Sequence, residues 1–198
     1  MGPEQEKTRA GKGKSRPADA VTAGGIPGEA EERRIRPARR ISLRPFSVSD
    51  VDFVISRQLA LYNAEYGFDS GTWKAYLTGG VHAFLEQFDP ARDCMLICEQ
   101  DGLPAGCIAI THADEATAQL RFFFLEPAAR GQGAGRLLLD QAVGFCRQKK
   151  YDRIVLWTFS TLPAARHLYG NKGFRITDTR ENTEWGKRIL EERWELEL

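Results

Sequence analysis

The chain has 198 residues, of which 42% are hydrophobic and 28% are charged, so it is long enough for one domain with a sizeable core and a short additional segment. Its formal net charge is +1, which excludes the strong overall positive charge typical of nucleic-acid-binding proteins. No apolar run approaches the roughly 18 residues that a membrane-spanning helix requires, so we expect no membrane partner.

The charges are unevenly distributed. Residues 1–40 hold ten Lys and Arg against six Asp and Glu, whereas residues 41–198 hold 18 against 21. The first segment is rich in Gly, Pro and Ala and has no aromatic residue, so it cannot bury enough apolar surface to offset the entropy of ordering. We therefore predict a disordered basic tail over 1–40 and a folded domain over 41–198. A weak electrostatic tether to nucleic acid or another partner is the alternative role of the tail.

Alternating and helical periodicities predict a mixed α/β domain. In chain order, the predicted elements are a strand at 41–45, helices at 47–65 and 70–88, strands at 94–99, 105–111 and 116–125, a helix at 133–148, a strand at 153–158, a helix at 163–171, and strands at 174–179 and 193–198. Gly79-Gly80 mark a point where the second helix would break. The strand at 116–125 is apolar on both faces, as a central strand buried on both sides must be.

The cysteines predict neither a zinc site nor secretion. They are Cys94, Cys98, Cys107 and Cys146. No Cys-x-x-Cys pair occurs, and no histidine lies within a few residues of a cysteine, so we expect no metal ligands. Small buried hydrophobic side chains in a reducing cytosol are the better interpretation. The N-terminus also has no apolar stretch typical of a secretory signal, so we expect a cytoplasmic protein.

A glycine-rich loop separates a buried strand from a helix. Its residues are Arg130, Gly131, Gln132, Gly133, Ala134, Gly135 and Arg136. Glycines let the backbone turn tightly and present its N–H groups to an anion, and the helix N-terminus adds partial positive charge, so the loop suits a phosphate or pyrophosphate. A Walker A loop needs Gly-Lys-Ser/Thr, and a dinucleotide fingerprint needs a glycine where Arg136 stands, so both nucleotide motifs fail. A helix start that only needs close packing is the alternative.

Three motifs resemble those of the GNAT superfamily of N-acetyltransferases. The loop matches the Arg/Gln-x-x-Gly-x-Gly/Ala signature through Arg130, Gly133 and Gly135. The run Phe124-Leu125-Glu126-Pro127 resembles the end of the family's strand just before that loop. The run from Ala164 to Phe174 resembles the family's Ala-x-x-x-Tyr-x-x-x-Gly-Phe helix and strand. Their order and spacing agree with the predicted elements.

The resemblance is closer still to one branch of that superfamily. The chain is similar to the acetyltransferase half of proteins that fuse a MarR-type winged helix to a GNAT domain. The matching segments are 61–67, 88–92, 156–158 and 194–196. The likeness covers about 41–198, and we expect no winged helix in the 40 residues before it.

This resemblance implies a fold and a cosubstrate. The fold would be a mixed sheet of about six to seven strands with about four helices, splayed open between its fourth and fifth strands, and acetyl-CoA would sit in the opening without a metal. Backbone N–H groups from Arg130 to Gly135 would hold the pyrophosphate, with Arg136 beside them. The backbone of Phe123, Phe124 and Leu125 would pair with the pantetheine arm as an added strand. The N–H of Leu125 would stabilise the developing oxyanion.

The resemblance also implies an activity: transfer of an acetyl group to a primary amine, of a small molecule or of a protein lysine, by direct attack. Tyr169 matches the family's general acid toward the coenzyme sulfur, and an amphipathic core tyrosine is the alternative. Glu65 is the first candidate general base, with Tyr62 one turn earlier beside the substrate. Glu126 is the second candidate, because it adjoins the sheet opening. A solvated surface carboxylate is the alternative for both.

Leu162 departs from the family pattern, which often has Asn at this place to contact the pantetheine. A non-catalytic module that binds acyl-CoA and acts in regulation is therefore the competing hypothesis. The family resemblance also allows a homodimer.

Overall fold

The structure is a computed structural model that describes residues 40–198. Its elements are β1 (Ile41–Pro45), α1 (Val51–Tyr66), α2 (Gly71–Glu86), β2 (Cys94–Gln100), β3 (Leu103–His112), β4 (Thr117–Leu125), α3 (Ala134–Gln148), β5 (Arg153–Phe159), α4 (Pro163–Lys172), β6 (Arg175–Asn182) and β7 (Ile189–Glu197). Short 3-10 turns precede α1 at Val48–Asp50 and follow β4 at Pro127–Ala129. The predicted disordered tail lies, except for Arg40, outside the described residues.

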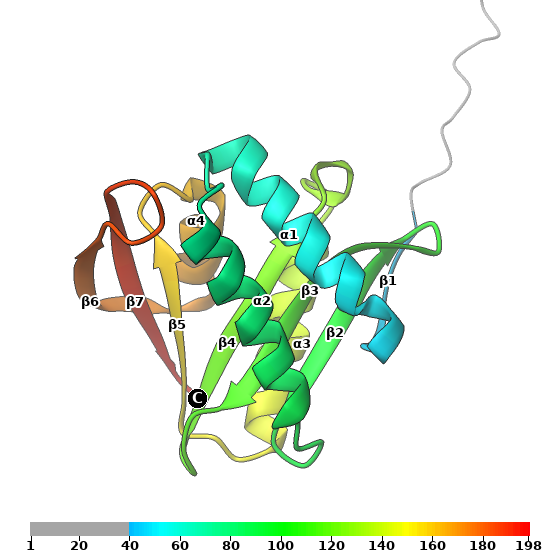
Figure 1. The fold of residues 1–198 in the computed structure, drawn as a ribbon. Coiled ribbons are helices and arrows are strands. Elements are labelled where there is room, and N and C mark those ends of the chain that lie inside the picture. The colour runs from blue at the N-terminus through cyan, green and yellow to red at the C-terminus, as the bar shows by residue number, and fades with distance from the viewer. Residues whose placement is uncertain (1–39) are drawn as a thin grey trace, which may run out of the picture. The chain divides into compact units, whose positions relative to one another are not determined.

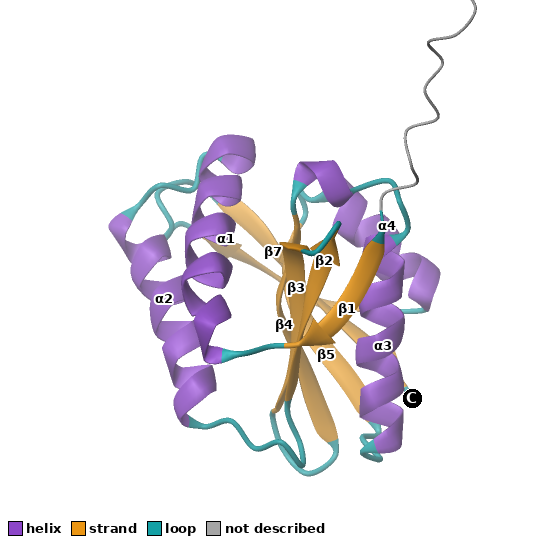
Figure 2. Ribbon diagram, turned by 90° about the vertical axis from the view of Figure 1, so that its right-hand side faces the viewer, coloured by secondary structure: helices purple, strands orange, loops and turns teal. Residues whose placement is uncertain are grey.

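One mixed sheet organises the domain. Its seven strands lie in the order β1-β2-β3-β4-β5-β7-β6, as the ribbon in Figure 1 shows. Helices α1 and α2 cover one face of the sheet, and α3 and α4 cover the other (Figure 2). The prediction of a mixed α/β fold with about six to seven strands and four helices is confirmed.

Several elements differ in extent from the predicted ones. Helix α2 is continuous through Gly79 and Gly80, because its apolar face runs unbroken from Trp73 to Phe84 and packing overrides the weak helix propensity of glycine. Helix α1 begins only at Val51, after a 3-10 turn. Strand β7 begins earlier than predicted because its first residues, Ile189 and Leu190, pair with Asn182 and Glu181 of β6.

The sheet opens between β4 and β5. These two strands run parallel, but their pairing covers only Thr117–Gln119 against Arg153–Val155. Strand β4 then continues to Leu125 and β5 to Phe159 without further pairing between them. At Phe122, where φ is 51°, β4 carries a bulge opposite β3, and bulges bend a strand and increase its twist. The predicted splay between the fourth and fifth strands is confirmed.

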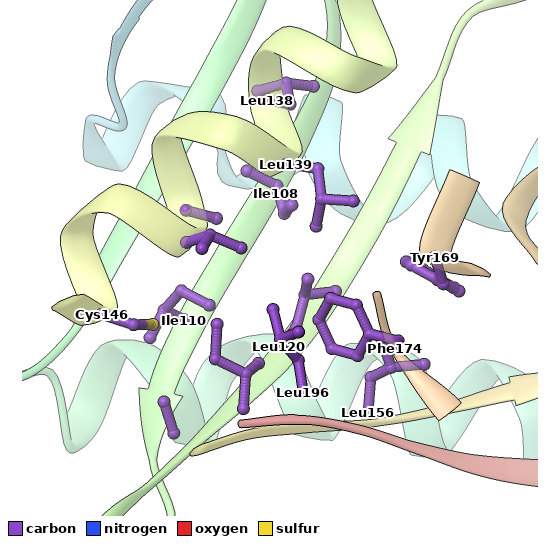
Figure 3. Packing of buried hydrophobic residues seen from close by; sticks show 14 of the residues in the cluster. Ile108, Ile110, Leu120, Leu138, Leu139, Cys146, Leu156, Tyr169, Phe174 and Leu196 are labelled. Atoms are coloured by element: carbon purple, nitrogen blue, oxygen red, sulfur yellow. The ribbon is translucent and has the colours of Figure 1, made fainter. Parts of the chain in front are cut away.

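Each face of the sheet has its own core. On the α3 and α4 side, Leu138 and Leu139 of α3 lie over Ile108 and Leu120 of the sheet (Figure 3). On the other side, α1 and α2 pack a second cluster around Val54, Leu77 and Phe124. Burying such side chains against the sheet is the main source of stability for both layers.

The cysteines lie inside these cores. Cys98, Cys107 and Cys146 are buried, Cys94 is partly buried, and all four are free thiols. Burial raises the pKa of the Cys94 thiol to about 12 and that of Cys146 to about 12, so both behave as small apolar groups at neutral pH. Residues 40–198 bring together no group of three His, Cys, Asp or Glu side chains able to hold a metal ion. No helix within the same range has the length and apolarity of a bilayer span.

Candidate active site

A cavity of about 150 Å³ lies where β4 and β5 separate. Side chains from α1, α2, β4, β5, α4, β6 and β7 form its wall. Three residues that the sequence singled out, Tyr62, Phe123 and Tyr169, are among them. The opening of the sheet therefore brings together groups that are more than 100 positions apart in the chain.

Tyr169 lies in the wall of this cavity on α4 and is 4% exposed. Its ring packs against Phe123, Phe174 and Trp194, with centroids 6.2, 5.7 and 6.1 Å away. Within residues 40–198 its hydroxyl has no hydrogen-bond partner, so the group is available to a ligand. Burial raises the pKa of the Tyr169 hydroxyl far above its ordinary value, so the hydroxyl carries its proton throughout the physiological range and can only donate it.

The glycine loop forms a nest of free N–H groups at the start of α3. Gly131 and Gly133 have φ values of 73° and 82°, in the left-handed region that side chains disfavour, so glycine is required at both. The first backbone bond of the helix is the one that the Leu137 N–H donates to the Gly133 carbonyl, at 3.0 Å. Between Gly131 and Arg136, the backbone N–H groups have no partner in the described part of the chain. Such a nest at a helix N-terminus is an anion site.

The sequence predicts that the backbone N–H of Arg130 also belongs to this anion-binding loop, but the structure places it differently. Its N–H donates to the Pro127 carbonyl at 3.2 Å, so it does not join the free donors. Its guanidinium instead donates to both carboxylate oxygens of Glu65, at 3.0 and 2.7 Å, and to the Leu125 carbonyl at 2.9 Å. The hydrogen bonds from Arg130 hold the pKa of Glu65 below its usual value. Glu65 therefore contacts the loop, and it is not among the residues that line the cavity.

Glu126, the other predicted carboxylate, is engaged in the same way. Arg57 on α1 donates to its two oxygens at 2.7 and 3.0 Å. The two ion pairs, Glu65 with Arg130 and Arg57 with Glu126, together tie α1 to the segment that joins β4 to α3. They therefore fix the position of α1, which contributes to the cavity wall, relative to the loop.

The far edge of β4 offers backbone groups to the opening. The Glu126 N–H donates to the Ala105 carbonyl of β3 at 2.8 Å. Because successive residues of a strand direct their N–H groups to opposite edges, the N–H of Leu125 faces away from β3, toward β5. Strand β5 does not pair with β4 at this level. Within the residues that the structure describes, the Leu125 N–H is thus a donor without a strand partner at the opening. The side chain of Phe124 points away, into the core under α1 and α2.

A second groove lies between α3 and α4, on the same face as the loop. It has a volume of about 430 Å³ and includes Arg136, Lys172 and Asn171 in its wall. Arg136 is in the first turn of α3, one residue beyond Gly135. Lys172 donates to Asp140 at 2.5 Å. The wall of the groove thus has two cationic side chains and one carboxylate, Asp140, which pairs with Lys172.

Four cavity residues have no recognisable motif in the sequence: Gln58, Trp73, Arg121 and Glu191. Gln58 is a polar residue in the buried stripe of α1, between Val54 and Leu61, which is the one signal that could have drawn attention to it. The other three look like ordinary members of a helix or a strand.

Glu191 is the carboxylate in the cavity wall and is 1% exposed. It forms an ion pair with Arg180, and it accepts a hydrogen bond from Asn182 at 3.0 Å. Its neighbour Glu192 is 3% exposed and points to the opposite face of β7, where Arg166 and Trp194 donate to it at 2.9 and 3.1 Å. The two adjacent carboxylates are therefore matched in burial and pairing, but only Glu191 reaches the cavity.

Comparison with protein families gives one match, the model described as "Acetyltransferase (GNAT) family", over residues 58–174. The chain is 31% identical over 87 residues to a mycothiol acetyltransferase of Beutenbergia cavernae, and 26% identical over 96 residues to an uncharacterized N-acetyltransferase of Schizosaccharomyces pombe. These alignments cover 44% and 48% of this chain but 29% and 59% of the relatives, so the chain spans less than two thirds of their length.

Solved structures share the fold. An acetyltransferase of Streptococcus agalactiae superposes with a TM-score of 0.63 at 21% identity, covering 80% of this chain and 98% of the other. The protein yncA of Salmonella typhimurium, solved with its cofactor acetyl-CoA, gives 0.65 at 16% identity, covering 80% and 94%. The PaiA N-acetyltransferase of Thermoplasma acidophilum, solved with coenzyme A, gives 0.61 at 18% identity, covering 80% and 99%.

Proposed function

Because the chain belongs to the acetyltransferase (GNAT) family, we propose that it is an acetyl-CoA-dependent N-acetyltransferase that moves an acetyl group to a primary amine. The observation that carries the proposal is the cavity at the β4–β5 opening, which has the buried hydroxyl of Tyr169 in its wall. The proposal is supported by the acetyl-CoA and coenzyme A bound to the fold relatives yncA and PaiA.

The chain has groups that fit acetyl-CoA. The free N–H groups from Gly131 to Arg136 suit the pyrophosphate, and Arg136 with Lys172 suits further phosphate charge in the groove between α3 and α4. The unpaired edge of β4 at Phe123 to Leu125 suits an extended, amide-bearing arm, which would pair there as an added strand. No metal enters this proposal.

The acyl transfer needs a donor at the thioester oxygen. We assign this role to the Leu125 N–H, which faces the opening. A preformed donor of this kind stabilises negative charge as it develops, and removing one costs about 2.7–4 kcal/mol in well-studied acyl-transfer enzymes. Arg130 orients the same residue by binding its carbonyl oxygen at 2.9 Å.

Two protons must move. The attacking amine has to lose one, and the departing thiolate has to gain one. Tyr169 is the donor to the thiolate in this proposal, since its protonated hydroxyl belongs to a residue of the cavity wall and has no partner within residues 40–198. We assign the uptake of the amine proton to Glu191, the carboxylate in the cavity wall, rather than to Glu65 or Glu126, which do not line the cavity.

The finer parts of the sequence interpretation remain predictions. They are the resemblance to MarR/GNAT fusion proteins, the cytoplasmic location, the homodimer and the role of the tail. The four free cysteines suit a reducing compartment.

Thiol release from acetyl-CoA across a panel of primary amines tests the proposal. We expect release that depends on at least one amine, with the acetylated amine identified by mass spectrometry. If calorimetry shows binding of acetyl-CoA but no amine causes thiol release, the result would contradict catalysis and favour the non-catalytic acyl-CoA-binding module. The feature of the chain that favours this module is Leu162 in the cavity wall, where the family often has Asn.

A further inference from the structure

The cavity contains polar atoms that the protein itself does not satisfy. Gln58 Oε1 and Trp73 Nε1 are buried side-chain atoms without a hydrogen-bond partner in the described part of the chain. Both residues line the cavity, and they are 5% and 3% exposed. Buried polar groups are almost always paired, because leaving one unpaired costs free energy. One acceptor and one donor therefore await a ligand that supplies a donor and an acceptor.

A third polar group in the wall is the guanidinium of Arg121. It is partly buried in the cavity wall and has no carboxylate partner within residues 40–198. It lies over the ring of Phe122, 4.7 Å from the centroid. Gly80 on α2 makes room for it, since a Cβ there would come within 2.9 Å of Nη2. An arginine held in this way without a counterion is suited to a carboxylate brought by a ligand.

The rest of the wall is flat and apolar. Trp73 stacks on Tyr62 with centroids 5.1 Å apart, and Trp185 lies 5.1 Å from Trp73 and 5.2 Å from Phe159. A cavity of about 150 Å³ is of the size that accepts a benzene ring. These dimensions favour a compact acceptor with an apolar or aromatic body.

From these contacts we propose that the acceptor is a small free amino acid with an apolar or aromatic side chain. Its amine would donate to Gln58 Oε1, its carboxylate would supply the acceptor oxygens that Trp73 Nε1 and Arg121 lack, and its side chain would lie against the aromatic wall. The side chain of a protein lysine, like a polyamine, offers only donors, so it would leave Trp73 and Arg121 unpaired. This inference rests on the proposed function, whose site it deepens.

The first test compares three acceptors that differ at the carboxylate: phenylalanine, phenylalanine amide and phenethylamine, with Nα-acetyl-lysine methyl ester as the protein-lysine mimic. We expect kcat/KM for phenylalanine to exceed that for phenethylamine by roughly 10- to 100-fold, the size of a charge-assisted hydrogen-bonded contact. Equal rates for the two, or a preference for the lysine mimic, would overturn the inference while leaving N-acetyl transfer intact.

The second test uses variants. Arg121→Gln should bring the preference for phenylalanine over phenethylamine close to one by raising KM for phenylalanine, with KM for acetyl-CoA unchanged. Trp73→Phe, which removes the indole N–H but keeps an aromatic ring in the wall, should lower the preference in the same direction. Arg175→Gln is the matched control, because Arg175 is exposed on β6 and does not line the cavity. A preference that survives Arg121→Gln would overturn the inference.

Binding separates this inference from the proposed function. Titration of phenylalanine and of phenethylamine into the protein saturated with coenzyme A, followed by calorimetry, needs no turnover. If no amine releases thiol, the proposed function fails, and tighter binding of phenylalanine that Arg121→Gln removes would still support an amino acid site. Equal binding of the two ligands, or no binding of either, would overturn it.

Discussion

The two faces of the open sheet present different kinds of group to a ligand. On the α3 and α4 face, the loop presents backbone N–H groups, and two glycines with positive φ hold them in place. On the α1 and α2 face, the cavity presents side chains, namely Gln58, Trp73 and Arg121. Backbone recognition tolerates most side-chain changes outside the glycines, whereas side-chain recognition changes with each substitution. Such a division suits an enzyme with one fixed cosubstrate and an acceptor that differs among relatives.

Tyr169 joins the two faces, and its removal should have the largest effect. Tyr169→Phe keeps the ring against Phe123 and Trp194 but deletes the proton donor, so we expect kcat to fall by about 1000-fold, within the range of general acid catalysis. Steady-state thiol release measures it. Tyr151→Phe is the matched control: its hydroxyl donates to the Arg92 carbonyl at 2.9 Å, away from the cavity. Unchanged turnover in Tyr169→Phe would remove the assignment.

The next largest loss of kcat should follow from replacing Glu191, which lies in the wall of the cavity. Glu191→Gln removes the proton acceptor, so we expect kcat to fall by about 100-fold. Glu192→Gln, similarly buried and paired but on the other face of β7, should destabilise the fold to a similar extent while retaining kcat. Thermal unfolding of both variants separates stability from chemistry. If Glu192→Gln loses as much kcat as Glu191→Gln, the loss reflects destabilisation instead.

The KM for acetyl-CoA should depend on the glycines of the loop on the α3 and α4 face. Gly133→Val forces a β-branched residue to a φ of 82°, which costs about 1–3 kcal/mol when the conformation is kept. We expect the loop to shift and KM for acetyl-CoA to rise on the order of tenfold, with the acceptor KM unchanged. Gly144→Ala on α3 is the control, since no atom lies within 4 Å of the added Cβ. A normal KM for acetyl-CoA in Gly133→Val would exclude the loop as the anion site.

The smallest effect is expected at the two ion pairs that tie α1 to the segment joining β4 to α3. Glu65→Gln weakens one of the two ion pairs that tie α1 to the loop, and partly exposed pairs contribute about 0–1 kcal/mol. We therefore expect kcat to change by less than about fivefold and the pH–rate profile to keep its shape. Because Arg130 lowers the pKa of Glu65, the carboxylate is ionised at neutral pH and binds protons weakly. Loss of a limb of the profile would restore Glu65 as the general base.

The same contrast explains what the sequence could predict. The loop at 130–136 is a local motif, because a nest of N–H groups needs only consecutive residues and glycines in the right places. The strands, the splay between β4 and β5 and the cavity position of Tyr169 followed from periodicity and family resemblance. Arg130 is the exception within the motif: its N–H closes a 3-10 turn, a detail that spacing does not reveal.

The residues of the cavity on the α1 and α2 face lie far apart in the sequence. Gln58, Arg121 and Glu191 come from α1, β4 and β7, and only the tertiary fold brings them together. Glu65 and Glu126 were predicted near the substrate from their neighbourhood in the chain, but neither lines the cavity. Which carboxylate faces the cavity depends on packing between distant segments, and neither hydrophobic periodicity nor motif spacing encodes it.

Calorimetric titration of acetyl-CoA into the wild type, Gly133→Val and Arg121→Gln tests most directly whether the cosubstrate is held by the backbone of one face and the acceptor by the side chains of the other. We expect Gly133→Val to weaken acetyl-CoA binding on the order of tenfold and Arg121→Gln to leave it at the wild-type value. Equal weakening in both variants, or wild-type affinity in Gly133→Val, would contradict this division of the site.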